Sequence, residues 1–293
     1  MTVTGPEPTC VWPAGARLGE GPVWDQMDQA LYWVDIKAPS IHRFTPATGE
    51  QRTWPMPEMI GAIARRRAGG FIATLKSGFA LLDLETGAIE RLGNPEYDLP
   101  SNRFNDGKCD TAGRFWAGTM DDREREPTGW LYRLDPDRSW RRLDGPYVCT
   151  NGPAFSPDGR TLYHTDTVGR EIHAFDLAAD GGLTRKRCYA RFAEADGYPD
   201  GMTVDTEGHV WVCHWGGWRV TRFTPAGVVE RVIRMPVAQV TSCAFGGSDL
   251  TTLYITSAAI GLAPKAQREQ PLAGGVFAVP LPIRGIAAAS YGG

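Results

Sequence analysis

The sequence lacks an excess of charge, a long apolar run and a recognisable export signal. Lys and Arg number 31 against 34 Asp and Glu, which gives a formal charge of −3 and a pI near 6.0. This balance gives no electrostatic reason to expect nucleic acid or an anionic membrane as a partner. No apolar run is long enough to cross a bilayer, and the first ten residues, MTVTGPEPTC, have neither the basic start nor the apolar core of a secretory signal. We therefore expect a cytoplasmic protein with no nucleic-acid or membrane partner and no obligatory protein partner.

Several familiar catalytic and metal-binding motifs are also missing. The six cysteines never occur as Cys-x-x-Cys and show no zinc spacing, so we expect them to be small buried hydrophobic residues in a reducing compartment. No Gly-x-Ser-x-Gly turn, Walker loop or dinucleotide glycine motif occurs, which excludes serine-nucleophile, NTPase and Rossmann interpretations. The five histidines form no His-x-x-x-His pair and are expected to be ordinary sheet residues. His214, in CHWGGWRV, is the best exception, because glycines bring its backbone close to neighbouring chain.

The sequence is rich in turn-forming residues and poor in helical patterns. The chain has 35 glycines, 22 prolines and 10 tryptophans, and its apolar residues alternate with a period of two between turn dipeptides. No segment shows a sustained 3.6-residue period bounded by helix caps. The pattern predicts an all-β protein with little helix.

Six segments share one order of turn, aromatic-rich strand, polar gap and second strand. They begin at residues 25, 66, 110, 156, 205 and 247, so that successive starts are 41 to 49 residues apart. A period of this length with about four strands per unit is typical of β-propeller blades, which bury their faces against each other around a central axis. We therefore predict a six-bladed β-propeller in which residues 1–293 form one domain. A pair of β-sandwiches is the main alternative, but it does not explain one repeat along the whole chain.

The strand before the first turn of each unit should line the central channel. Counting back five residues from each turn gives one position per blade, and in chain order these positions are Glu20, Gly61, Asn105, Asn151, Asp200 and Ser242. If the repeats are in register, the four larger polar side chains reach the same height at one mouth of the channel.

Two carboxylates and two amides at one level need a compensating partner, because burying an unpaired charge is costly. Glu20, Asn151 and Asp200 would offer a divalent cation only oxygen ligands, and three protein ligands would leave positions open for water and substrate. The alternative is that each polar residue caps local backbone beside its turn. A common register in four blades favours the metal site.

Other polar residues should lie near these side chains at the mouth of the channel. Arg103 and Asn105 are two apart on an alternating strand and so point to one face, where Arg103 is either a substrate-binding donor or a rim charge. Asp106 is expected to hold its strand or a neighbouring loop. The charge run over residues 121–126 is typical of a solvated loop, although one of its carboxylates could reach the channel mouth.

These segments together resemble the senescence marker protein, regucalcin and gluconolactonase family of six-bladed propellers. The resemblance extends over about residues 12–282 and rests on long segments: LGEGPVWD (18–25), LYWVDI (31–36), SNRFNDGKCD (101–110), RFWAGTM (114–120), TNGPAFSPDGRTLYHTDT (150–167), PDGMTVDTEGHVWVCHWGG (199–217) and VTSCAFGG (240–247). It implies hydrolysis of a sugar-acid lactone with one divalent metal ion (Ca, Mn, Fe(II), Zn or Mg).

The resemblance also implies roles for individual residues. Glu20, Asn151 and Asp200 correspond to the metal ligands of the family, and Arg103 and Asn105 to its substrate-contacting pair. The family has an acidic residue soon after GTM, for which Asp122 is the candidate here.

The implied mechanism is metal-assisted attack of water on the lactone carbonyl, with Asp200 as the general base. We expect a pentonolactone such as xylonolactone or arabinonolactone, or gluconolactone, as the substrate in oxidative sugar catabolism. Two alternatives stay open: hydrolysis of phosphotriesters on the same fold, and a calcium-binding propeller without catalysis.

Overall fold

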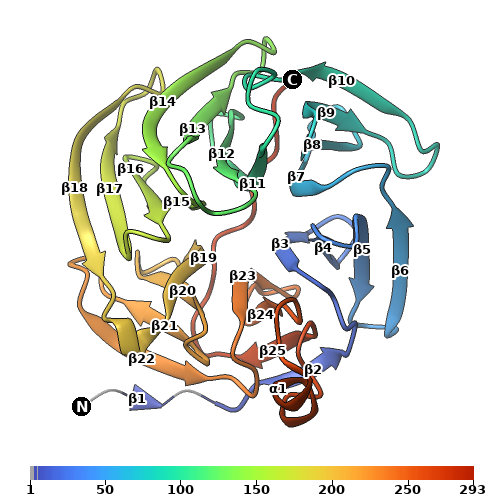
Figure 1. Ribbon diagram of the computed structural model, residues 1–293, viewed down its shortest axis with the longest axis vertical. Coiled ribbons are helices and arrows are strands. Elements are labelled where there is room, and N and C mark those ends of the chain that lie inside the picture. Colours follow the sequence, from blue (N-terminus) through green and yellow to red (C-terminus); the bar gives the residue numbers. More distant parts are fainter. Residues whose placement is uncertain (1–2, 5) are drawn as a thin grey trace.

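Short strands separated by tight turns pair in sequence order into six antiparallel sheets that surround a central channel (Figure 1). The computed structural model describes residues 3–4 and 6–293. Each sheet is one blade, with its first strand at the channel and its last strand at the rim. The predicted six-bladed β-propeller is confirmed.

The strands occupy four successive positions in the blades. The innermost strands are β3 (Gly19–Asp25), β7 (Ile60–Arg65), β11 (Asn102–Cys109), β15 (Thr150–Phe155), β19 (Tyr198–Val204) and β23 (Val240–Gly246). The second strands are β4 (Ala30–Asp35), β8 (Phe71–Leu75), β12 (Phe115–Asp121), β16 (Thr161–Asp166), β20 (Val210–Trp215) and β24 (Thr252–Ser257). The third strands are β5 (Ser40–Thr45), β9 (Gly78–Leu82), β13 (Gly129–Leu134), β17 (Glu171–Leu177), β21 (Arg219–Phe223) and β25 (Val276–Pro280). The outermost strands are β6 (Glu50–Pro55), β10 (Ile89–Gly93), β14 (Trp140–Tyr147), β18 (Leu183–Arg191), β22 (Val229–Arg234) and β2 (Thr9–Trp12).

The last blade is built from both ends of the chain. Strand β2, near the N-terminus, pairs antiparallel with β25 and so becomes the outermost strand of a blade that otherwise begins at residue 240. This pairing closes the ring of blades without a covalent link. A further short strand, β1 (Val3–Thr4), pairs in parallel with β22 and widens the fifth blade. The repeat in the sequence did not indicate either pairing.

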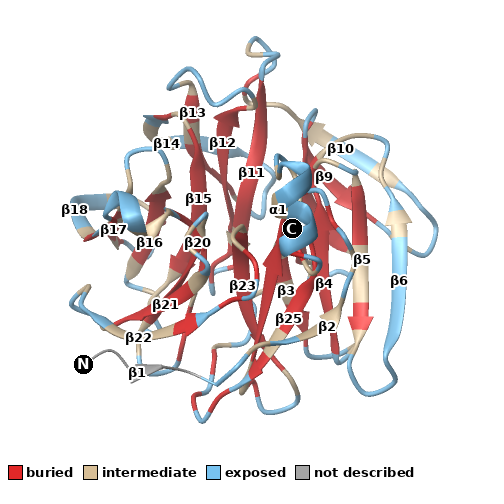
Figure 2. Cartoon of the chain, turned by 60° about the horizontal axis from the view of Figure 1, so that its bottom comes forward, coloured by how far each residue is buried: buried red, intermediate tan, exposed pale blue. Residues whose placement is uncertain are grey.

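Burial falls from the channel to the rim, as Figure 2 shows. The second strands carry the fully buried Trp33, Trp116 and Trp211, which fill the space between blades. In residues 3–4 and 6–293, helix is confined to the 3-10 turn η1 (Glu194–Asp196) and the exposed α1 (Pro264–Glu269), which confirms the prediction of little helix. Within the part of the chain that the structure describes, no helix has the length and apolar character needed to span a membrane.

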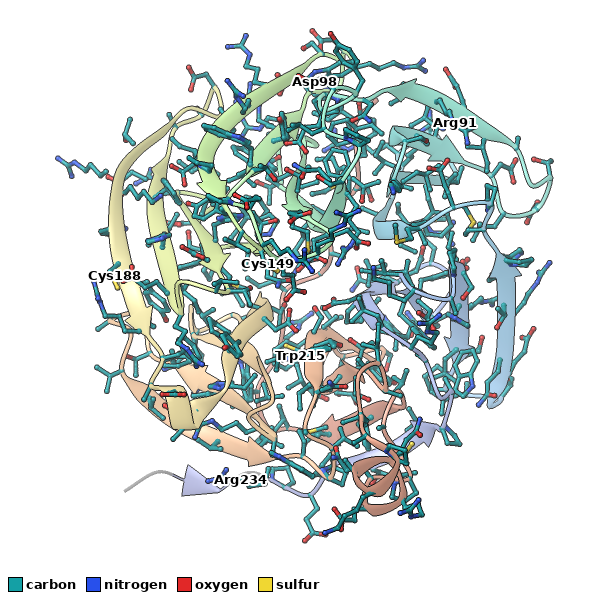
Figure 3. The ribbon with its side chains drawn as sticks, in the orientation of Figure 1. Arg91, Asp98, Cys149, Cys188, Trp215 and Arg234 are labelled. Carbon is teal, nitrogen blue, oxygen red and sulfur yellow. The ribbon has the colours of Figure 1, made fainter. Side chains whose placement is uncertain are left out.

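The cysteine prediction holds for four of the six residues. All six are free thiols, and Cys109, Cys149, Cys213 and Cys243 are buried as expected. Cys10 is half-buried and Cys188 is exposed, so the prediction is wrong for Cys188. Cys188 belongs to the outermost strand β18, in which residues 184–188 are all exposed to solvent at the rim (Figure 3).

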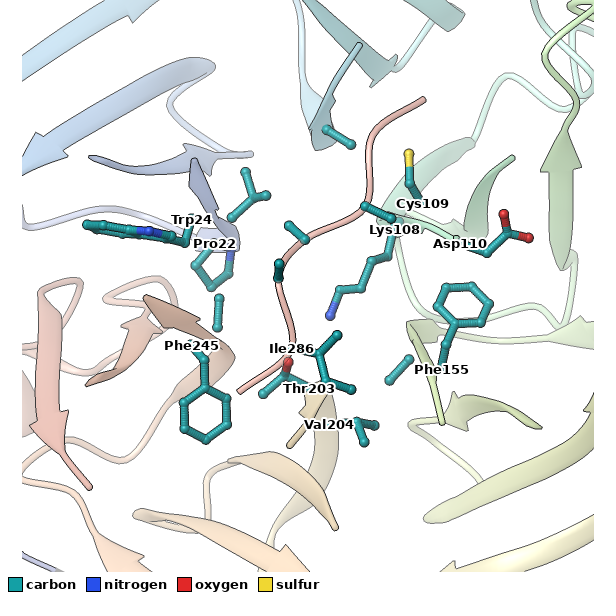
Figure 4. Close-up of a pocket in the computed structure, with 18 of the residues that line it drawn as sticks. Pro22, Trp24, Lys108, Cys109, Asp110, Phe155, Thr203, Val204, Phe245 and Ile286 are labelled. Carbon is teal, nitrogen blue, oxygen red and sulfur yellow. The ribbon is translucent and has the colours of Figure 1, made fainter. Parts of the chain in front are cut away.

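The C-terminal tail crosses the channel where the inner strands end. Residues 286–289 line a small cavity of about 100 Å³ there, together with apolar side chains of the inner strands (Figure 4). Lys108 points into this space and donates a hydrogen bond to the carbonyl oxygen of Met202 at 2.8 Å. The tail therefore narrows this end of the channel and leaves the opposite end for a ligand.

A buried ion pair connects the strands of the fifth blade. Asp205 is fully buried and accepts hydrogen bonds from Trp211 Nε1 at 2.8 Å and Arg222 Nε at 2.9 Å. Glu207 also accepts a bond from Arg222, at 2.6 Å, but its side chain is 59% exposed. The same cation thus has a fully buried anionic partner in Asp205 and a largely exposed one in Glu207, besides the half-buried Glu230 at 3.1 Å.

Asp205→Ala should lower the free energy of unfolding by about 3–5 kcal/mol, because it leaves the buried Arg222 guanidinium without its buried counter-charge. Glu207→Ala is the matched control and should cost less than about 1 kcal/mol, because exposed ion pairs contribute little. Urea unfolding of both variants measures the difference. Equal losses in the two variants would contradict the importance of the buried pair.

Candidate active site

All six inner strands share one irregularity near their beginnings. In each of them the pairing with the second strand shifts by a β-bulge, at Glu20/Val23, Ile60/Ala62, Phe104/Gly107, Asn151/Ala154, Pro199/Met202 and Val240/Cys243. A bulge turns the side chains beside it away from the normal alternation of a strand. The six bulges lie at the positions that the sequence repeat put in register, and this directs one polar side chain from each of four blades toward the axis.

Glycines beside these bulges let the inner strands approach each other. A Cβ atom on Gly61 would lie 2.5 Å from the carbonyl oxygen of Asn105, and one on Gly201 would lie 2.2 Å from Ser242 Oγ. Only glycine fits at such distances. These two glycines let the inner strands come close enough for the larger polar side chains beside the bulges to meet.

The side chains meet in a cavity of about 500 Å³ at the end of the channel where the inner strands begin. Its polar lining residues are Glu20, Lys37, Arg103, Asn105, Asp122, Glu124, Asn151, Thr167 and Asp200. Its apolar and aromatic lining residues are Leu18, Met120, Cys149, Val168, Tyr198, Trp215 and Ile260. The cavity thus contains every residue that the sequence analysis assigned to metal or substrate.

A chain of hydrogen bonds fixes the amides in this cavity. Arg103 Nη1 donates to Asn105 Oδ1 at 2.6 Å, and Asn105 Nδ2 donates to Asn151 Oδ1 at 3.0 Å. Asn151 Nδ2 donates to Thr167 Oγ1 at 2.9 Å, so its amide oxygen is turned toward Asn105. Because both polar atoms of the Asn105 side chain form these hydrogen bonds, Asn105 orients Arg103 and Asn151.

A second set of bonds places a carboxylate at the rim. Asp122 Oδ1 accepts bonds from Arg103 Nε at 2.5 Å and from Lys37 Nζ at 2.6 Å. These two cations hold the pKa of Asp122 below its usual value despite its partial burial. Asp121, in contrast, accepts bonds from the backbone N–H groups of residues 123, 125 and 126 and so holds the loop. Of the Asp121-Asp122 pair, Asp122 is therefore the one that faces the cavity.

Three carboxyl groups lie close together near the axis of the central channel. Glu20, Asp106 and Asp200 are 3–5% exposed, and burial raises the pKa of each of them. The Asp106 charge raises the pKa of Glu20 further, to about 8, while Glu20 and Asp106 together raise the pKa of Asp200 well above its usual range. The protein alone therefore leaves this cluster with too little positive charge to keep all three groups ionised.

The family described as SMP-30/Gluconolactonase/LRE-like region matches residues 18–259. The chain belongs to this family.

Its relatives extend over nearly its whole length. The chain is 38% identical over 285 residues to 6-deoxy-6-sulfogluconolactonase of Pseudomonas putida, covering 97% of this chain and 98% of that protein. It is 36% identical over 293 residues to regucalcin of Oryctolagus cuniculus, with the same coverage of 97% and 98%. The solved structure of a calcium-binding protein, regucalcin, from Agrobacterium tumefaciens is 28% identical, has a TM-score of 0.94 and covers 99% of both chains.

The donor set of this family member fits a hard divalent cation. Glu20 and Asp200 supply two carboxylates, and the Asn151 amide oxygen supplies a neutral donor. Among the residues that the structure describes, no group of three His, Cys, Asp or Glu side chains suited to a metal was found. The third donor here is instead the Asn151 amide, and a cation held by these three residues would relieve the repulsion that raises the pKa of both carboxyl groups.

Some residues of the site were missed in the sequence. Lys37 and Thr167 hold Asp122 and Asn151 from the turns that follow β4 and β16, and no local motif marks either of them. Asp106 does bind the backbone N–H of Gly152 as expected of a structural residue, yet it also belongs to the acid cluster. His214, the exception among the histidines, does not line this cavity, whereas its neighbour Trp215 does, as Figure 3 shows near the channel.

In chelator-treated protein, stability should fall as pH rises from about 4.5 to about 8. The pKa of Glu20 is raised from 4.5 to about 8 in the folded chain, so within this window the folded state keeps a proton that the unfolded state has released. Glu20→Gln should reduce this decline and make the variant more stable than the parent at pH 8. Thermal unfolding at pH 5 and pH 8 measures it, with the exposed Glu85→Gln as control. A parent and a Glu20→Gln variant with the same dependence on pH would contradict the prediction.

Proposed function

We propose that this chain hydrolyses a sugar-acid lactone, with a divalent cation held by Glu20, Asn151 and Asp200. The observation that carries the proposal is the position of two buried carboxylates and an oriented amide oxygen beside an Arg103–Asp122 pair in one cavity. Membership in the SMP-30/gluconolactonase family and the sulfogluconolactonase relative support it.

The cation, when bound, supplies Lewis-acid polarisation of the lactone carbonyl. Asp200 accepts a proton from the water whose oxygen attacks the carbonyl carbon, since its carboxyl group lies at the axis among the ligands. When the ring C–O bond breaks, Asp200 returns this proton to the departing alkoxide oxygen. The product is an open-chain aldonic acid.

The remaining polar side chains hold the sugar. Arg103 and Asp122 offer a donor and an acceptor to hydroxyl groups of the ring, and their mutual bond of 2.5 Å fixes both in place. Trp215 and Ile260 form part of the apolar wall of the cavity, against which the C–H face of a sugar ring packs. A cavity of about 500 Å³ accepts a pentonolactone such as xylonolactone or arabinonolactone, and gluconolactone.

Metal-dependent turnover tests the proposal. Chelator-treated protein should not open xylono-, arabinono- or gluconolactone above the spontaneous rate, and one of Ca, Mg, Mn, Zn or Fe(II) should restore hydrolysis in a pH-stat. Asp200→Asn keeps the shape of the side chain and removes the base, so kcat should fall about 10²-fold or more. The exposed Asp249→Asn is the control and should keep the parent rate.

Two other results would overturn the proposal. Tight cation binding without turnover of any lactone would favour a calcium-binding propeller without catalysis; the Agrobacterium tumefaciens relative is described as a calcium-binding protein. Turnover of phosphotriesters without turnover of lactones would assign a different hydrolysis to the same site.

A further inference from the structure

A second polar cavity lies between the fourth and fifth blades, away from the channel. It has a volume of about 340 Å³ and is lined by side chains of β18, β20, β21 and β22 and of the connection that contains Asp196. Figure 3 shows one of its lining residues, Arg234, at the rim of the ring beside β22. None of its lining residues belongs to the cavity that contains Glu20, Asn151 and Asp200.

One face of the fifth blade brings basic side chains together in this cavity. His214 pairs across the strands with Arg219, and Arg219 pairs with Arg234, so the three side chains stand in one row. Like charges directly opposite each other on neighbouring strands are unfavourable unless a counter-charge is present. The nearby Arg222 and Arg231 form a similar pair, and Asp205, Glu207 and Glu230 neutralise it.

The row at the cavity has less compensation. Arg219 forms an ion pair of 2.6 Å with Asp196. Arg234 is exposed to solvent, and its side chain has no ion pair or hydrogen bond among the residues that the structure describes. An anion in the cavity would supply the missing counter-charge.

Two buried polar atoms also lack partners here. His214 and Thr221 are each 1% exposed, and His214 Nε2 and Thr221 Oγ1 form no hydrogen bond within the described part of the chain. Leaving such atoms without a hydrogen-bond partner is unfavourable. Both residues line the cavity, so a ligand there can satisfy them.

The histidine shows which hydrogen-bonding group the ligand must carry. His214 Nδ1 lies 2.8 Å from the carbonyl oxygen of Asp196 and 3.3 Å from Arg219 Nε. Because a carbonyl oxygen only accepts and its contact is the shorter of the two, we assign the proton of the neutral ring to Nδ1. Burial lowers the pKa of His214 to about 4, which keeps the ring neutral. Nε2 therefore presents a lone pair and needs a donor.

We propose that this cavity binds a small oxyanion that also carries a hydroxyl group, with Arg219 and Arg234 holding the negative charge and His214 Nε2 accepting the hydroxyl hydrogen. Thr221 Oγ1 bonds to the same ligand. Hydrogen phosphate and a 2-hydroxycarboxylate share this chemistry, and the cavity volume admits either of them.

Titration calorimetry on the chelator-treated full chain at pH 7.5 tests the proposal without reference to lactone hydrolysis. The probes are potassium phosphate against sulfate, and lactate against acetate, since each pair differs in the presence of a hydroxyl group. The hydroxylated anion of a pair should bind about tenfold more tightly, which corresponds to one hydrogen bond. Tighter binding of phosphate identifies hydrogen phosphate as the ligand class, and tighter binding of lactate identifies a hydroxycarboxylate.

Variants connect the binding to this cavity. Arg234→Gln and Thr221→Val should each weaken binding of the preferred anion about tenfold, whereas Arg185→Gln, an exposed arginine of the fourth blade, should not change it. Thr221→Val should also unfold at the parent temperature or above it without the anion, because it removes a buried hydroxyl that has no partner. No saturable binding of phosphate or lactate, equal binding within both pairs, or full affinity in Arg234→Gln would overturn the proposal.

Discussion

The mutual repulsion of carboxyl groups at the axis is the constraint on which the rest of the site depends. Six inner strands bulge at one height, and glycines such as Gly61 and Gly201 let them approach until Glu20 and Asp200 share one cavity. Without a compensating cation, the folded chain must keep protons on these groups, which shows in their raised pKa values. The fold thus maintains an arrangement that is unfavourable by itself and that a bound cation would stabilise.

The polar residues around the carboxyl groups form one hydrogen-bond network that fixes their orientation. Arg103 orients Asn105, Asn105 orients the Asn151 amide, and Arg103 also fixes Asp122 at the rim. These residues come from two neighbouring blades, the third and the fourth, so their geometry depends on how the blades pack. The C-terminal tail narrows the other end of the channel, which leaves the cavity at the start of the inner strands as the place for a substrate.

The fold and the axial residues could be predicted because a repeat makes equivalent positions visible. The count back from each turn found Glu20, Asn151 and Asp200 without any structure, since the blades keep one register. The ring closure by β2 could not be found in this way, because the pairing depends on contacts between distant parts of the chain. Lys37 was missed for a similar reason: it reaches Asp122 from another blade, 85 residues away.

A crystal structure of the protein grown with calcium tests the central claim most directly. We expect one fully occupied ion in the cavity at the start of the inner strands, with oxygens of Glu20, Asn151 and Asp200 within about 2.3–2.6 Å of it and water in the remaining positions. A cavity without an ion at saturating calcium would contradict the assignment of these three residues as cation ligands. So would an ion held elsewhere, with Glu20 and Asp200 left uncoordinated.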